Sequence, residues 1–260
     1  MEGRMARANR HFIPGCIWHI THRCHQKEFL LRFAHDRSRF IAWLAEARKR
    51  FGLQLLNYTV TSNHVHLLVK DSGGADTIPS AMQLIAGRTG QEYNQRKGRK
   101  GAFWEDRYHA TAIETGEHLR SCLVYIDLNM VRAGAVSHPA EWEHCGYQEI
   151  QGERRRNRLL ALDVLADAAG VGGRDALAAA HREWVEAVLI AQRQQREDMW
   201  SKSVAVGSAE FVRKTKELLG LRARGRKIAM KGDAFMLREA EEPYGADYAP
   251  ENRPIGGEIR

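Results

Sequence analysis

Long apolar runs are absent from this sequence. No window holds the ~18 consecutive apolar residues that a membrane-spanning helix needs. The first residues, Met-Glu-Gly-Arg-Met-Ala-Arg-Ala-Asn-Arg, lack the apolar core of a signal peptide. We therefore expect a cytoplasmic protein with no membrane partner.

Cysteine is scarce, and acidic residues are outnumbered by basic ones. The four cysteines among 260 residues are too few and too scattered for a disulfide framework, so we expect free thiols in a reducing compartment. The 40 Lys and Arg against 32 Asp and Glu leave a net charge of +8, which attracts polyanions such as nucleic acid. The 43% of hydrophobic residues suffices for a packed core.

The first 150 residues alternate between strand and helix patterns. Apolar periodicity predicts a strand, a helix, two strands, a helix, a strand and a helix, with Gly52 and Gly134 ending the first and last helices and Thr115 capping the last. This order predicts an α+β fold, with a ferredoxin-like antiparallel sheet and helices packed on it. The expected strands are residues 16–23, 53–61, 64–70 and 110–113, and the expected helices are residues 29–50, 78–94 and 115–133.

Composition changes near Gly152. Three consecutive arginines at 154–156 open a region whose apolar residues recur mostly at helical spacing, so we expect a helical C-terminal extension over residues 151–221. The segment from 222 to 260 mixes charge, Gly and Pro, and we expect a flexible tail there.

Residues 64–70 place two histidines on one face of a strand. Because side chains alternate along a strand, His64 and His66 point to the face opposite Val65, Leu67 and Val69. A rise of ~3.3 Å per residue puts their Cα atoms roughly 6.6 Å apart, close enough for two neutral imidazoles to bind one cation. A half-exposed sheet face without a ligand is the alternative interpretation.

Tyr125 and Asn129 lie four residues apart in the expected last helix. They therefore share one face, which Arg132 extends. An amide oxygen is a ligand suited to Mg²⁺ or Mn²⁺, and a deprotonated phenol is a nucleophile. A tyrosine used only for packing is the alternative. The two patterns complement each other, because the histidine pair needs a third ligand and the nucleophile needs a cation that polarises its target.

Five stretches, in order, resemble the single-tyrosine HUH transposases of insertion-sequence type, and most closely the REP-associated tyrosine transposases. Residues 63–69, Asn-His-Val-His-Leu-Leu-Val, look like the HUH motif, and residues 125–134, Tyr-Ile-Asp-Leu-Asn-Met-Val-Arg-Ala-Gly, are similar to the tyrosine motif. Met130 stands where the family usually has proline, and Thr61 where methionine is common. The other similar stretches are residues 14–21, 104–108 and 207–212.

The resemblance implies an enzyme that transfers DNA strands. It implies that Tyr125 is the nucleophile and that His64, His66 and Asn129 hold Mg²⁺ or Mn²⁺. Single-stranded DNA bearing hairpins, at REP-like repeats or element ends, would be cleaved through a 5′-phosphotyrosine and then rejoined by attack of a 3′-OH. Residues 1–150 would form the HUH domain of a monomer or homodimer, associated with the nucleoid when bound to DNA. A catalytically silent DNA-binding regulator on the same fold is the alternative.

Cations next to aromatic residues indicate where DNA would lie. Cations meet phosphates, and aromatic rings stack on unpaired bases. His19 and His109 are expected either beside the metal ligands or facing DNA. The expected DNA contacts are Arg7, Arg10, Arg96, Lys97, Arg99, Lys100, Trp104, Arg107, Tyr108 and Arg132.

Overall fold

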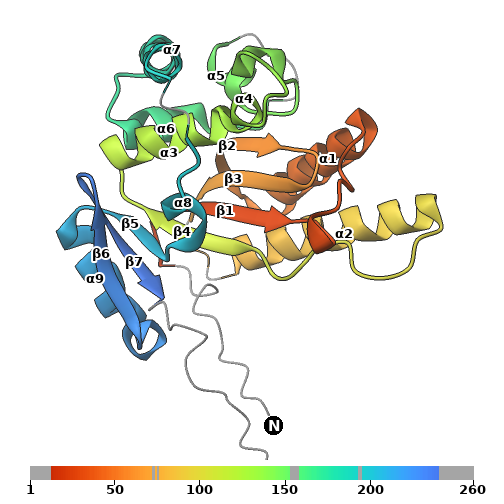
Figure 1. Ribbon diagram of the computed structural model, residues 1–260, viewed down its shortest axis with the longest axis horizontal. Coiled ribbons are helices and arrows are strands. Elements are labelled where there is room, and N and C mark those ends of the chain that lie inside the picture. Colours follow the sequence, from red (N-terminus) through yellow and green to blue (C-terminus); the bar gives the residue numbers. More distant parts are fainter. Residues whose placement is uncertain (1–12, 72–73, 75, 153–157, 193–194, 240–260) are drawn as a thin grey trace, which may run out of the picture.

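The computed structural model describes residues 13–71, 74, 76–152, 158–192 and 195–239. Within these residues the strands form one sheet in the order β2-β3-β1-β4-β5-β7-β6 (Figure 1). All neighbouring strands are antiparallel except β4 and β5, which are parallel. The strands are β1 (Ile17–Arg23), β2 (Gln54–Val60), β3 (His64–Lys70), β4 (His109–Ile113), β5 (Ala205–Gly207), β6 (Arg226–Lys231) and β7 (Ala234–Glu239).

The first four strands, in the order β2-β3-β1-β4, have the ferredoxin-like arrangement, so the expected α+β fold is confirmed. The helices differ from expectation at their ends. The first begins at Ala34 rather than at residue 29, and the second continues past Asn94 to Lys97, where Gly98 closes it with a φ of +59°. The longer helices are α1 (Ala34–Phe51), α2 (Thr77–Lys97), α3 (Glu117–Asp127), α6 (Leu162–Ala169), α7 (Arg174–Ile190) and α9 (Ala209–Leu219). The short helical segments are η1 (His25–Lys27), α4 (Asn129–Arg132), η2 (Pro139–Glu141), α5 (Tyr147–Ile150), α8 (Met199–Lys202) and η3 (Gly220–Ala223).

The two faces of the sheet differ in chemistry. Residues paired across neighbouring antiparallel strands share a face, so Thr21 and Thr59, which both pair with His66, lie on the same face as that histidine. The apolar face packs toward α1 and α2, and α3 and α8 cover the polar face (Figure 1). The polar face carries His19, Thr21, Asn57, Thr59, His64, His66, His109 and Thr111.

Both faces are buried. Val65, Leu67 and Val69 have no exposed surface, as their alternation predicts, and His66 on the opposite face is only 3% exposed. A half-exposed sheet face is therefore the wrong interpretation for His66. A buried polar face needs internal hydrogen-bond partners, because water cannot supply them there.

The C-terminal part of the chain contributes strands as well as helices. β5 pairs with β4 and β7 pairs with β5, so residues 205–239 extend the sheet of the first 150 residues. The expected tail contains the β6–β7 hairpin; residues 240–260 lie outside the described part. The sequence did not reveal β5, because it has three residues and its partner β4 is some 90 residues away. The β6–β7 hairpin is local and was missed because the charge, Gly and Pro of residues 222–260 indicated a tail. No described helix is long and apolar enough to cross a membrane.

Candidate active site

The helix expected over residues 115–133 is two helices. α3 begins after Gly116, whose φ is +76°, rather than after a capping Thr115. It ends at Asp127, Leu128 has a φ of −76° and a ψ of 7°, and α4 begins at Asn129. The hydroxyl of Thr59 donates a 3.1 Å hydrogen bond to the carbonyl oxygen of Ile126, where the interruption occurs. Asn129 therefore begins a new helical turn instead of continuing the helix of Tyr125.

A buried carboxylate anchors the end of α3. Asn57 on β2 donates a hydrogen bond of 3.0 Å to one oxygen of Asp127, and Nε2 of His181 on α7 lies 2.8 Å from the other. The side chains of Asp127 and His181 are fully buried. Because Asp127 lies two residues after Tyr125, this contact holds the tyrosine helix against both the sheet and α7.

The structure brings Tyr125, His64, His66 and Asn129 together within one chain. The rings of Tyr125 and His66 have centroids 6.0 Å apart, and those of His64 and His66 are 4.9 Å apart. Nδ2 of Asn129 lies 2.8 Å from Nε2 of His66. Tyr125 also approaches His19, with ring centroids 6.2 Å apart.

Hydrogen bonds determine which nitrogen of His66 is protonated. Burial lowers the pKa of His19 to about 3, so its ring is neutral at pH 7. Nδ1 of His19 lies 2.8 Å from the carbonyl oxygen of Trp200, which can only accept, so this nitrogen carries the proton. Nε2 of His19 then accepts from Nδ1 of His66 at 2.8 Å. The lone pair of His66 is therefore on Nε2, beside Asn129.

His64 has the same tautomer for a different reason. Its Nδ1 lies 2.8 Å from the side-chain oxygen of Asn63 and 3.0 Å from the hydroxyl of Thr61, so Nδ1 donates and the lone pair is on Nε2. Burial and then the charges of Arg23, Arg196 and Arg132 lower the pKa of His64 to about 4. Burial likewise holds the pKa of His66 well below its usual value. Both imidazoles are neutral at pH 7.

The chemistry of this donor set fits a divalent cation. Nε2 of His64 and Nε2 of His66 each present a lone pair. Rotating the side-chain amide of Asn129 by half a turn exchanges its nitrogen and oxygen, so that the oxygen faces the same region. Among the described residues, no group of three or more His, Cys, Asp or Glu side chains could hold a metal ion. The present set has only two side chains of those types, and its third donor is an amide.

Arg132 lies directly over the ring of Tyr125. Its Cζ is 4.1 Å from the ring centroid, and it donates a 2.6 Å hydrogen bond to the carbonyl oxygen of Tyr125. Burial raises the pKa of the Tyr125 phenol, and the charges of Arg132 and Arg196 act in the opposite direction. The phenol forms no hydrogen bond with a described residue. Its oxygen is therefore not engaged by the residues around it.

A cavity of about 520 Å³ adjoins Tyr125, and we call it the tyrosine pocket. Tyr125 and Arg132 line one part of it, and Trp184, Trp200 and Arg120 line another. The guanidinium of Arg120 lies 5.3 Å from the ring centroid of Trp184. Aromatic rings next to cations are the surface that unpaired nucleotides favour.

The expected DNA contacts fall into different environments. Arg96 forms an ion pair with Asp36, and Arg99 with Glu28 at 3.3 Å. Trp104 is half-buried: its indole donates to the carbonyl oxygen of Ala86 at 3.0 Å, and it stacks on His22 with centroids 4.1 Å apart. Lys97, Lys100 and Arg107 are exposed, and Tyr108 is half-buried. Arg7 and Arg10 lie outside the described residues.

The C-terminal part of the chain supplies contacts that the motifs did not reveal. Trp200 contacts His19 through its backbone carbonyl oxygen. A pattern of side chains in the sequence cannot predict such a contact. Trp184 borders the tyrosine pocket from α7, a helix whose spacing predicted only packing. His19, expected either beside the ligands or facing DNA, is buried against His66, with ring centroids 5.0 Å apart.

Residues 13–129 match the family described as "Transposase IS200 like". A solved REP-associated tyrosine transposase bound to a REP hairpin is similar at 19% identity and a TM-score of 0.49, over 57% of this chain and 86% of that one. A putative transposase from Deinococcus radiodurans R1 is similar at 16% identity and a TM-score of 0.33, over 46% and 90%. No curated protein matches the chain.

Proposed function

We propose that this chain, a transposase whose residues 13–129 belong to the IS200-like family, cleaves and rejoins single-stranded DNA through Tyr125. One observation carries the proposal. The phenol ring lies 6.0 Å from the ring of His66, whose Nε2 lone pair lies beside Asn129. The residues of the proposed nucleophile and of the proposed cation site thus lie together in the fold.

In this proposal His64, His66 and Asn129 hold Mg²⁺ or Mn²⁺. When bound, such an ion polarises the scissile phosphate and stabilises charge that develops on its oxygens. His19 and Asn63 keep the two imidazoles in the tautomer that presents Nε2. Arg132 supplies a second positive charge next to the nucleophile.

The bonds change as follows. The Tyr125 oxygen attacks phosphorus, the phosphorus–O3′ bond breaks, and the phenolic proton is passed, directly or through solvent, to the leaving 3′ oxygen. The products are a 5′-phosphotyrosine and a free 3′-OH. A 3′-OH then attacks the phosphotyrosine, which joins the strands and returns the proton to Tyr125. No nucleotide is consumed, because each step exchanges one phosphodiester bond for another.

The tyrosine pocket is the proposed place for unpaired nucleotides beside the scissile phosphate. The half-buried Trp184 supplies a ring face, and Arg120 and Arg132 supply charge. The substrate in this proposal is a single strand with hairpins, such as a REP-like repeat or an element end. We propose that Lys97, Lys100 and Arg107 contact its phosphates, because these cations are exposed and form no ion pair with a described residue.

A covalent adduct tests the proposal. A 5′-labelled and a 3′-labelled pool of hairpin-bearing single strands with randomised flanks is incubated with the protein and Mn²⁺, then denatured. We expect only 3′-labelled DNA to stay attached to the protein, because Tyr125 retains the 5′ phosphate of the downstream fragment. EDTA and the Tyr125→Phe substitution should both abolish the adduct.

Tyr93→Phe is the matched control, because Tyr93 is a half-buried tyrosine on α2 whose ring packs on Phe103. It should leave adduct formation unchanged. The proposal is wrong if the wild-type chain forms no adduct or if Tyr125→Phe forms as much. Binding of the same DNA without any adduct would instead favour the silent regulator.

A further inference from the structure

Nearly all of the excess positive charge of the chain falls in one short segment. Residues 213–231 contain eight Lys or Arg and one Glu, a net charge of +7, whereas the whole chain carries +8. The segment runs through the second half of α9, through η3 and along β6. It lies outside the residues that match the transposase family, which end at 129.

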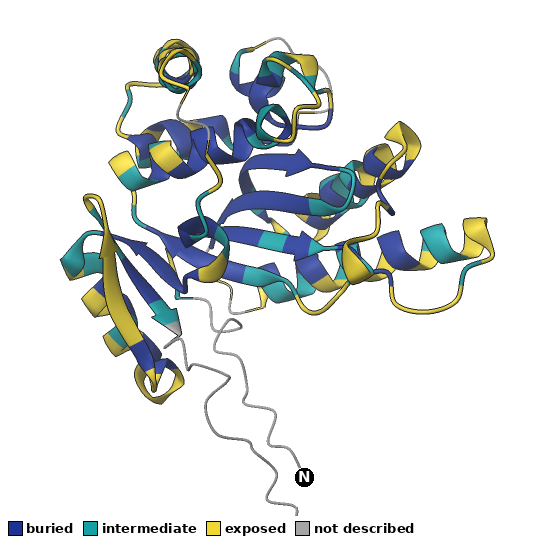
Figure 2. Cartoon of the chain, in the orientation of Figure 1, coloured by how far each residue is buried: buried dark blue, intermediate teal, exposed yellow. Residues whose placement is uncertain are grey.

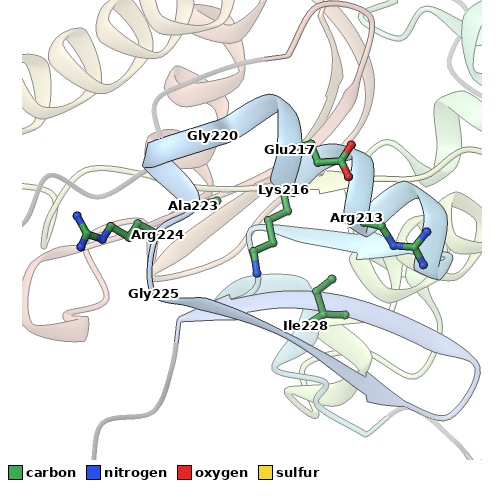
Figure 3. Close-up of a pocket in the computed structure, with 8 residues that line it drawn as sticks. All are labelled: Arg213, Lys216, Glu217, Gly220, Ala223, Arg224, Gly225 and Ile228. Atoms are coloured by element: carbon green, nitrogen blue, oxygen red, sulfur yellow. The ribbon is translucent and has the colours of Figure 1, made fainter.

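Three of these cations, Arg213, Lys216 and Arg224, line a concave surface of about 510 Å³, together with Glu217 and Ile228, and we call this surface the basic hollow. Figure 3 shows Lys216 pointing from α9 toward Ile228 on β6, with Arg213 and Arg224 extending away on opposite sides. The positive charge therefore comes from α9, from the turn before β6 and from β6 itself.

Four cations of this segment have no acidic partner among the described residues. Arg213, Lys216, Arg224 and Lys227 form no ion pair with any described residue, whereas cations elsewhere do, as with Arg174 and Asp163 at 2.5 Å. β6 is exposed along nearly its whole length, in contrast to the buried strands β1 to β4 (Figure 2). Repulsion among like charges is a cost that a bound polyanion would remove.

The composition of the surface favours duplex over unpaired DNA. Residues 213–231 contain no aromatic side chain, so the segment has none of the rings on which unpaired bases stack. Cations alone suit the phosphate backbone of a duplex, which is bound through charge and without reading sequence. Lysines on an edge strand can also serve to prevent pairing with other strands. That role would account for Lys227 but not for Arg213 and Lys216 on α9.

The position of the basic hollow relates it to the candidate active site. β6 is four strands from β1 in the same sheet, a separation of roughly 19 Å at the usual spacing between strands. We propose that the basic hollow and β6 bind the phosphates of a double-stranded stem, while the adjoining single strand enters the tyrosine pocket. The second half of this statement rests on the proposed function, but stem binding does not.

Salt-dependent binding tests the proposal without any cleavage. The full chain in EDTA is titrated into a fluorescein-labelled 30-base-pair duplex of arbitrary sequence at several salt concentrations. Log K falls as log salt rises, and each lost phosphate contact reduces the magnitude of this negative slope by about 1. The triple variant Arg213→Gln, Lys216→Gln, Arg224→Gln, which removes the three cations that line the hollow, should therefore lower the magnitude of that slope by about 3 and weaken duplex binding at every salt concentration.

Two further variants separate position from charge and from folding. Lys49→Gln, Arg50→Gln, Arg182→Gln removes three exposed cations from α1 and α7 and should keep the wild-type slope. Arg213→Lys, Lys216→Arg, Arg224→Lys preserves the charge and should keep the wild-type slope too. The proposal is overturned if the first control reduces the magnitude of the slope as much as the triple variant does. It is also overturned if the triple variant loses as much affinity for a 30-nucleotide single strand as for the duplex. It is also overturned if the triple variant keeps duplex binding and loses only binding to anionic phosphatidylglycerol vesicles. Because Tyr125 takes no part, a failed adduct experiment leaves this test valid.

Discussion

Nδ1 of His19 lies 2.8 Å from the carbonyl oxygen of Trp200, a residue 181 positions further along the chain. His19 in turn contacts His66, so a backbone group of the C-terminal region determines the tautomer of a residue in the histidine pair. Removal of such a partner usually weakens metal binding, because the ligand nitrogen is then no longer held with its lone pair toward the ion.

We expect His19→Ala to lower Mn²⁺ affinity by about 10- to 100-fold. His19→Gln should lose less, since an amide can donate to Trp200 and accept from His66. Titration calorimetry with Mn²⁺, together with adduct yield as a function of Mn²⁺ concentration, measures this. Thr111→Val is the control, because Thr111 donates to the carbonyl oxygens of Ser203 and Trp200 but does not contact His66. An unchanged Mn²⁺ affinity in His19→Ala would contradict the positioning role.

Arg132→Met should slow adduct formation at pH 7. The charge of Arg132 lowers the pKa of the Tyr125 phenol against the raising effect of burial, so its loss raises that pKa and leaves less phenolate at a given pH. We expect a rate loss on the order of 10² and a pH profile displaced upward. Arg132→Lys retains the charge and should retain much of the profile. Initial rates of adduct formation between pH 6 and pH 10 measure this displacement. A Met variant with the wild-type pH profile would refute the electrostatic role of Arg132.

Trp184→Ala should weaken the binding of unpaired DNA. Loss of one base–aromatic stack costs about 1–3 kcal/mol. Trp43→Ala is the matched control. Arg88 lies 5.4 Å from the ring centroid of Trp43, much as Arg120 lies 5.3 Å from that of Trp184. Trp43, however, is on α1, away from the tyrosine pocket. Fluorescence anisotropy with a 12-nucleotide single strand and with a duplex measures both variants. Equal losses for the two tryptophans, or for the two probes, would exclude stacking in the tyrosine pocket.

Stability should fall as the pH drops below about 6.5. The unfolded chain then binds protons on its histidines, while burial holds the pKa of folded His19 at about 3, those of His22 and His64 at about 4, and that of His66 well below its usual value. Each such histidine contributes a slope of about 1.4 kcal/mol per pH unit, so these four give up to about 5–6 kcal/mol per unit. Above pH 6.5 both states are neutral and these groups have no effect.

Urea unfolding at pH 7 and pH 5 measures this slope. His22→Phe should reduce this slope by about a quarter, because phenylalanine can keep the stack on Trp104 but cannot titrate. Replacement of the exposed His35 by Gln is the matched control and should leave the slope unchanged. Equal stability of the wild type at the two pH values would show that the buried histidines are not held neutral.

Local pattern was sufficient for much of the first 130 residues. Strand alternation placed Val65 and His66 on opposite faces, and a left-handed glycine ended α1 at Gly52. Four-residue spacing brought Tyr125 and Asn129 to the same side of the fold, although the helix is interrupted between them. These features depend on neighbours within a few positions, which the sequence displays directly.

Only the tertiary structure decided the rest. The sequence by itself determined the order of strands and helices along the first 130 residues and the candidate residues of the site, since both follow from short-range periodicity and motif. The interruption at Leu128 accompanies contacts from Thr59 and His181, and the tautomer of His66 depends on Trp200. The pairing of β5 with β4, likewise, joins residues some 90 positions apart. Such contacts form between groups that only folding brings together, so no local pattern specifies them.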